Sequence, residues 1–208
     1  MLIETGPYST FKTLSEGIEK AGYQVSDIQH VLLTHIHLDH AGSAWEESDG
    51  TIKFDAAFYK EPVLGVDGGT AEIRGEWSGE YATEEGVLTL VEIPPQGDAK
   101  LIETALIGEF PQVDPRYRGK HRNLVALASG ASTSRPGSTA LAVHNWTSGE
   151  SQSFEFGYNR MVEEFLFVPK QGGQSDLDSW LVGPVLNIKS GVREIYVFDA
   201  AHVSAGPV

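Results

Sequence analysis

The stretch Ile52-Lys53-Phe54-Asp55-Ala56-Ala57-Phe58 carries the pattern that decides the fold. Its side chains at positions 52, 54, 56 and 58 are apolar, and they alternate with Lys53 and Asp55. Because successive side chains of a strand point to opposite faces, this alternation predicts a half-buried β-strand.

Similar β-rich runs continue to the end of the chain. Turn-forming clusters such as Asp67-Gly68-Gly69 separate them. From about Glu46 onward no convincing helical period or clean internal repeat is present, and short strands spaced by roughly 10–15 residues are typical of antiparallel sandwiches, barrels or propellers. The Ser/Gly-rich stretch 129–139 is interpreted as a hairpin loop rather than a linker. The further runs fall at about 71–76, 86–93, 99–107, 122–128, 139–146, 160–168, 179–187 and 193–199.

The first 45 residues follow a different pattern. Leu2–Glu4 predicts a short strand, and apolar residues at positions 11, 14, 18 and 21 recur at helical spacing up to Gly22. His30–Thr34 then predicts a strand whose apolar core is buried on both faces. This opening is expected to form a short α/β segment of strand, helix and strand.

Composition excludes several classes of function. The chain has 208 residues, no cysteine and a net charge of −14. Thiolate zinc sites and cysteine nucleophiles are therefore excluded, and the acidic balance argues against a nucleic-acid or anionic-membrane partner. No run approaches the roughly 18 apolar residues of a membrane span. The start resembles no signal peptide, so a cytoplasmic protein is expected.

The strongest local signal is a histidine cluster directly after the second predicted strand. His35 and His37 are two residues apart, so in an extended segment they can converge on one ion. Asp39 and His40 lie at the following turn and could serve a second ion nearby. Imidazole and carboxylate without thiolate suit Zn²⁺, Fe²⁺ or Mn²⁺. The alternative is a set of scattered surface histidines with an Asp at a helix N-cap.

Residues 31–42, from Val31 to Gly42, resemble the first metal motif of metallo-β-lactamase-fold hydrolases. The resemblance covers about residues 1–45 and implies that His35, His37, Asp39 and His40 are ligands of a dinuclear centre that generates a hydroxide nucleophile. None of the later histidines stands in a sequence that resembles the remaining motifs of that family. They are His121, His144 and His202.

Residues from His40 onward resemble the carotenoid cleavage oxygenases. His40-Ala41-Gly42-Ser43-Ala44-Trp45-Glu46 is similar to the family's His-x-x-Asn-Ala-Trp-Glu segment, although Ser43 replaces the usual Asn. Residues 108–116 contain a similar Glu-Phe-Pro motif, and residues 162–170, 178–183 and 197–201 follow the family's C-terminal blades in order. The resemblance implies part of a seven-bladed β-propeller whose axis holds Fe²⁺ through four histidines. It further implies cleavage of a polyene or stilbene-like double bond by O₂.

Three residues take roles from this second resemblance. His40 matches the third iron-ligating histidine, and Glu109 and Glu164 match outer carboxylates that accept hydrogen bonds from ligand imidazoles. Such carboxylates orient the rings and supply negative charge to an Fe(II) ion held by neutral imidazoles. Without the resemblance, both glutamates would be assigned to solvated positions.

Three hypotheses remain open. The chain is interpreted as an apparent hybrid, with a metallo-β-lactamase-like segment over 1–45 and an incomplete carotenoid-oxygenase-like propeller over 46–208. An Fe(II) oxygenase acting on a small apolar polyene is the first hypothesis, although three of its four iron histidines are expected to be missing. A zinc hydrolase and a non-catalytic β protein are the alternatives. An incomplete propeller leaves open sheet edges, so self-association is also expected.

Overall fold

The structure is a computed structural model, and it describes residues 2–3, 11–28, 31–32, 44–59, 86–117, 119–130 and 137–208. Nearly half of the described residues lie in β-strands, far more than lie in helices, and the strands form three sheets. The prediction of a mainly β, propeller-like protein preceded by a short α/β segment is confirmed. No helix in these ranges is long and apolar enough to span a membrane.

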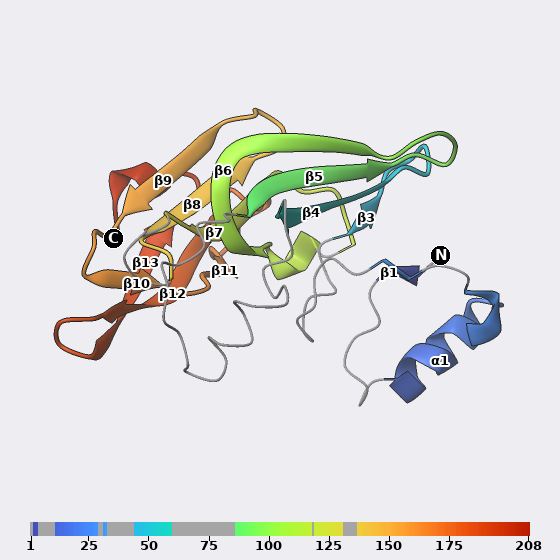
Figure 1. The fold of residues 1–208 in the computed structure, drawn as a ribbon, viewed down its shortest axis with the longest axis horizontal. Helices are drawn as coiled ribbons and strands as arrows, with labels where there is room; N and C mark the ends of the chain where they lie inside the picture. The colour runs from blue at the N-terminus through green and yellow to red at the C-terminus, as the bar shows by residue number, and fades with distance from the viewer. Residues whose placement is uncertain are drawn as a thin grey trace.

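The first sheet belongs to the α/β segment. Strand β1 (Leu2–Ile3) pairs in parallel with β2 (Val31–Leu32), and helix α1 (Phe11–Lys20) lies between them in the sequence. The helix stops before Gly22, whose φ of +86° suits the left-handed turn that ends many helices. A short 3₁₀ helix, η2 (Val25–Asp27), follows. Figure 1 shows α1 apart from the two larger sheets.

The second sheet is a seven-stranded antiparallel meander in which neighbours in sequence are neighbours in space (Figure 1). Its longest strand, β6, pairs with β5 through its first part and with β7 through its second part. The strands are β3 (Trp45–Glu46), β4 (Ile52–Phe58), β5 (Val87–Ile93), β6 (Lys100–Gln112), β7 (Leu124–Ser129), β8 (Ala140–Asn145) and β9 (Ser151–Glu155).

The third sheet follows without a helix between. Strand β12 (Ser179–Asn187) pairs with β10 (Arg160–Val162) and β11 (Leu166–Pro169) on one side and with β13 (Val192–Asp199) on the other. The run predicted as one strand over 160–168 is therefore two strands, and the connection between them carries Glu164. Two 3₁₀ turns, η3 (Pro115–Tyr117) and η4 (Val203–Ala205), complete the described elements.

The main core lies between the second and third sheets. Leu124, Ala126 and Ala128 of β7 pack in one cluster with residues of the third sheet such as Phe167 and Leu181. Val125 and Leu127 of the same strand point the other way into a second cluster with Leu88. Strand β7 is thus buried on both faces.

The stretch 52–58 differs at two positions from its predicted half-buried pattern. Phe54 and Ala56 are buried as expected, but Phe58 is 39% exposed. Asp55, predicted on the solvent face, is buried because Arg122 donates a hydrogen bond to its carboxylate inside the protein. The long-range ion pair, which alternation alone does not show, makes burial of this charge possible.

Candidate active site

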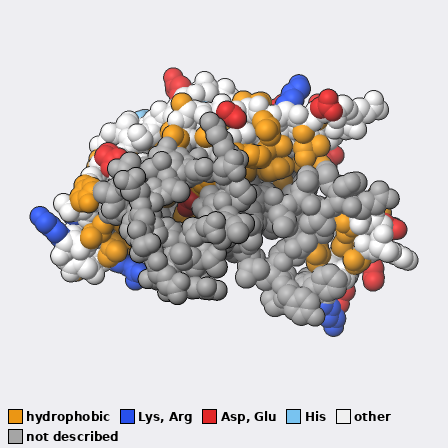
Figure 2. Space-filling model, in the orientation of Figure 1, with side chains coloured by type: hydrophobic (Ala, Val, Ile, Leu, Met, Phe, Trp, Pro, Cys, Tyr) orange, Lys and Arg blue, Asp and Glu red, His pale blue; other side chains and the backbone are white. Residues whose placement is uncertain are grey.

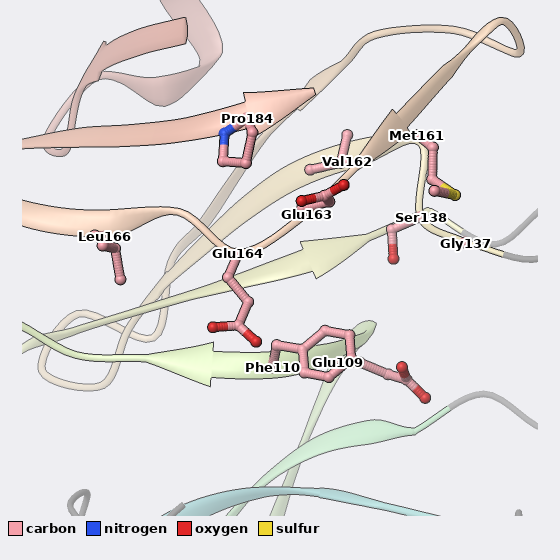
Figure 3. Close-up of a pocket in the computed structure, with 10 residues that line it drawn as sticks. All are labelled: Glu109, Phe110, Gly137, Ser138, Met161, Val162, Glu163, Glu164, Leu166 and Pro184. Atoms are coloured by element: carbon pink, nitrogen blue, oxygen red, sulfur yellow. The ribbon is translucent and has the colours of Figure 1, made fainter. Parts of the chain in front are cut away.

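A cavity of about 520 Å³ opens where β6 faces the connection between β10 and β11. Its described lining contains three carboxylates and no lysine or arginine, and most of its other side chains are apolar (Figure 3). The lining residues are Glu109, Phe110, Gly137, Ser138, Met161, Val162, Glu163, Glu164, Leu166 and Pro184. Both glutamates singled out in the sequence, Glu109 and Glu164, therefore lie on one cavity.

A β-bulge in β6 positions Glu109. Glu109 pairs with Ala128 and Gln112 pairs with Ala126, so β6 contains one more residue than β7 between these two pairs. Phe110 lies in this bulge and has a φ of +56°, a left-handed conformation that costs a non-glycine residue about 1–2 kcal/mol. Bulges of this kind turn side chains away from the regular alternation of a strand.

Glu164 follows β10, and its side chain extends toward the strand that carries Glu109 (Figure 3). The side-chain amide of Gln112 donates a hydrogen bond of 3.1 Å to the Glu164 carboxylate. Its neighbour Glu163 instead lies 3.6 Å from the guanidinium of Arg193, which is 71% exposed. The adjacent carboxylates thus have different partners, one uncharged and one cationic.

Tyr59, which directly follows β4, donates a hydrogen bond from its hydroxyl to the carboxylate of Glu109. Its ring lies against the backbone of Gly86, where a Cβ atom would come within 2.7 Å of the ring. Burial, together with the hydrogen bond to Glu109, raises the pKa of the Tyr59 phenol well above its ordinary value. Tyr59 therefore remains a neutral donor throughout the neutral range.

The later histidines lie elsewhere. His144 is buried on β8, its Nδ1 is 2.9 Å from Ser151 Oγ, and its ring packs edge-on against Trp146, so the structural interpretation of His144 fits this environment. His121 Nδ1 lies 3.2 Å from a Glu47 carboxylate oxygen. His202 Nδ1 lies 3.5 Å from Asp199. None of these three rings lines the cavity.

The predicted metal ligands His35, His37, Asp39 and His40 lie outside the described residues. Within the described part of the chain, no group of three or more histidine, aspartate or glutamate side chains is placed to hold a metal ion. Two of the three cavity carboxylates, Glu109 and Glu164, accept hydrogen bonds from uncharged donors, an arrangement compatible with the outer part of a metal site. The direct imidazole ligands would have to come from elsewhere.

Comparison with known proteins identifies the family. A sequence model of the family described as "RPE65: Retinal pigment epithelial membrane protein" matches residues 19–208. The chain belongs to this family. The match confirms the resemblance to the carotenoid cleavage oxygenases, and since it begins at residue 19 it includes the histidine cluster.

Two curated proteins resemble this RPE65-family chain. Resveratrol cleavage oxygenase 1 of Botryotinia fuckeliana is 26% identical over 173 residues, which are 77% of this chain and 30% of that protein. Lignostilbene-alpha,beta-dioxygenase isozyme III of Sphingomonas paucimobilis is 27% identical over 122 residues, 50% of this chain and 24% of that protein. The chain therefore spans about a third or less of the length of these relatives.

Solved structures support the fold. The cobalt-substituted apocarotenoid oxygenase of Synechocystis superposes with a TM-score of 0.67 at 23% identity, and the match covers 79% of this chain and 34% of that one. A chimera of that oxygenase with RPE65 gives a TM-score of 0.66 at 19% identity over the same shares. At this identity the likeness shows the fold alone.

Proposed function

We propose that this RPE65-family chain supplies part of an Fe(II) centre that cleaves a polyene or stilbene-like double bond with O₂. In that reaction the carbon–carbon double bond breaks, and each carbon receives one oxygen atom of O₂ as a carbonyl. The electrons that reduce O₂ come from the broken double bond, so no external reductant is needed. The names of the two curated relatives support this class of substrate.

The convergence of Glu109 and Glu164 on one cavity carries the proposal. Carboxylates outside the ligand sphere orient imidazoles and supply negative charge to a divalent ion. Apolar side chains of Phe110, Met161 and Leu166 line the same cavity, and such a wall favours a hydrocarbon substrate over a polar one. An acidic edge beside an apolar wall supports a proposed metal centre that acts on a hydrocarbon substrate.

His40 is the proposed direct ligand of this chain, because it matches the family's third iron histidine. His35 and His37 are close enough in sequence to share an ion with it. Only one of four family ligands is matched, so these 208 residues alone are proposed to bind at most one transition-metal ion, weakly, and without turnover.

Anaerobic Fe(II) titration of the purified protein tests the proposal. Wild type should bind no more than one equivalent, H40A and H37A should lose binding, and H202A, which alters an exposed histidine, should bind like wild type. Binding by H40A that equals wild type would contradict the assignment. Resveratrol and an apocarotenal should remain intact under O₂; tight iron with cleavage products would show that the chain carries a complete centre.

The interpretation of residues 1–45 as a metallo-β-lactamase-like segment stays a prediction. The parallel pairing of β1 and β2 agrees with a strand–helix–strand unit, but it does not identify a hydrolase. The zinc alternative predicts two bound Zn²⁺ ions and hydrolysis of an ester or lactam. The same titration with Zn²⁺ separates it from the iron proposal.

A further inference from the structure

The three carboxylates of the cavity differ in the charge of their partners. Glu163 is paired with the Arg193 guanidinium at an exposed position. Glu109 and Glu164 instead accept hydrogen bonds from uncharged groups, the Tyr59 hydroxyl and the Gln112 amide. A cation beside a carboxylate offsets its charge, whereas a neutral donor fixes the group and leaves the negative charge in place.

Different structural features place the two donors, Tyr59 and Gln112, beside their carboxylates. Tyr59 follows β4, and the missing side chain at Gly86 leaves room for its ring beside β5. Gln112 ends β6, on the far side of the bulge at Phe110. Glu109 lies on the near side, so a single bulge positions one carboxylate and the donor of the other.

We propose that Tyr59 and Gln112 are positioning residues that hold Glu109 and Glu164 at the cavity through uncharged hydrogen-bond donors. This inference rests on the proposed metal centre for its purpose, but the holding itself is a property of the protein without metal. A carboxylate that is fixed in advance needs no reordering when an imidazole or a metal ion approaches. Tyr59 and Gln112 would thus tune the site without touching substrate.

Carbon-13 NMR of protein labelled at the glutamate side-chain carboxyls tests the holding directly. The resonances of Glu109 and Glu164 are assigned by their disappearance in E109Q and E164Q. Y59F should then move the Glu109 resonance and leave that of Glu164, and Q112L should do the reverse. Y117F is the matched control, because the Tyr117 hydroxyl donates to the Gln174 carbonyl away from the cavity.

A second variant keeps the hydroxyl but displaces it. G86A places a Cβ atom against the Tyr59 ring, so it should also move the Glu109 resonance. If Y59F and G86A leave that resonance in place, or if Q112L leaves the Glu164 resonance in place, the positioning role is wrong.

Fe(II) affinity separates this inference from the proposed function. Loss of either donor should weaken Fe(II) binding about tenfold, the lower end of the effect seen when outer partners of metal ligands are removed. If Y59F moves only the Glu109 resonance and Q112L only the Glu164 resonance, but neither variant changes Fe(II) affinity, the positioning role is supported and the proposed iron centre is overturned.

Discussion

Gln112 donates a hydrogen bond of 3.1 Å to the carboxylate of Glu164, 52 residues further along the chain. The contact joins the end of β6 in the seven-stranded sheet to the connection between β10 and β11 in the third sheet. Together with the contact between Tyr59 and Glu109, it brings two acidic side chains to one apolar cavity. The expected consequences concern stability as well as metal binding.

The bulge in β6 predicts an unusual response at Phe110. At an ordinary strand position glycine is less stable than alanine by roughly 0.5–1 kcal/mol. At Phe110, with φ of +56°, F110G should instead be more stable than F110A by about 1 kcal/mol, because glycine relieves the left-handed strain. Urea unfolding measures the difference. F154G and F154A provide the control on β9, and the same order at both positions would contradict the strain.

Because of Asp114, the free energy of unfolding should decrease at acid pH. Burial alone would raise its pKa, but hydrogen bonds from Arg116 and Ser179 outweigh burial and hold the pKa below its ordinary value. Its contribution is therefore present above about pH 4 and is lost as the pH falls further. D114N should lower the free energy of unfolding by about 2 kcal/mol at pH 7.

The D114N difference should shrink at pH 3, where wild-type Asp114 also begins to bind a proton. Urea unfolding at both pH values checks this, with D98N at an exposed position as the control. A D114N difference that is equal at pH 3 and pH 7 would show that the charge of Asp114 contributes nothing.

The ion pair between Asp55 and Arg122 should be costly to break. Both side chains are fully buried, so D55N removes the carboxylate that is hydrogen-bonded to a buried guanidinium and should destabilise the protein by about 3 kcal/mol. The partly exposed pair between Lys53 and Glu92 is the comparison, and E92Q should cost about 1 kcal/mol or less. Equal losses in chemical unfolding would contradict this ranking.

Self-association is expected through the third sheet. Leu166 on β11 and Ile195 on β13 are 57% and 67% exposed, and the strand register places them on the same face. Hydrophobic side chains also reach the surface near this end of the molecule (Figure 2). I195K should reduce association in sedimentation velocity, because it places a charge on the exposed apolar face that carries Leu166 and Ile195. A wild-type monomer at all concentrations would contradict the expectation.

Strands with one apolar face were predictable from alternation, and strands with two apolar faces were predictable from continuous apolar runs. The stretches 179–187 and 193–199 agree with β12 and β13 to within one residue. The stretch 129–139 does connect the antiparallel strands β7 and β8, as predicted for a hairpin. Strand β9 was missed because Ser151, Gln152 and Ser153 are polar, and its pairing with β8 determines it instead. The run at 71–76 lies outside the described residues.

Glu109 and Glu164 could be singled out only through the sequence motifs shared with the carotenoid cleavage oxygenases. From the residues themselves, Glu164 beside Glu163 was assigned to a solvated position, yet it lies on the cavity and contacts Gln112. Tyr59 was missed because its hydrogen bond to Glu109 crosses 50 residues, and no local pattern encodes such a distance. Gln112 could have been noticed, since it lies in the same Glu-Phe-Pro-Gln motif as Glu109.

The most direct test of the account is Fe(II) affinity compared across the three cavity glutamates. Anaerobic titrations of E109Q and E164Q should each show binding weakened by about tenfold, because these carboxylates are proposed to act on the iron ligands. E163Q should bind like wild type, because Glu163 is paired with Arg193. Equal affinities in wild type, E109Q and E164Q would contradict the central claim that this cavity forms the carboxylate side of a metal centre.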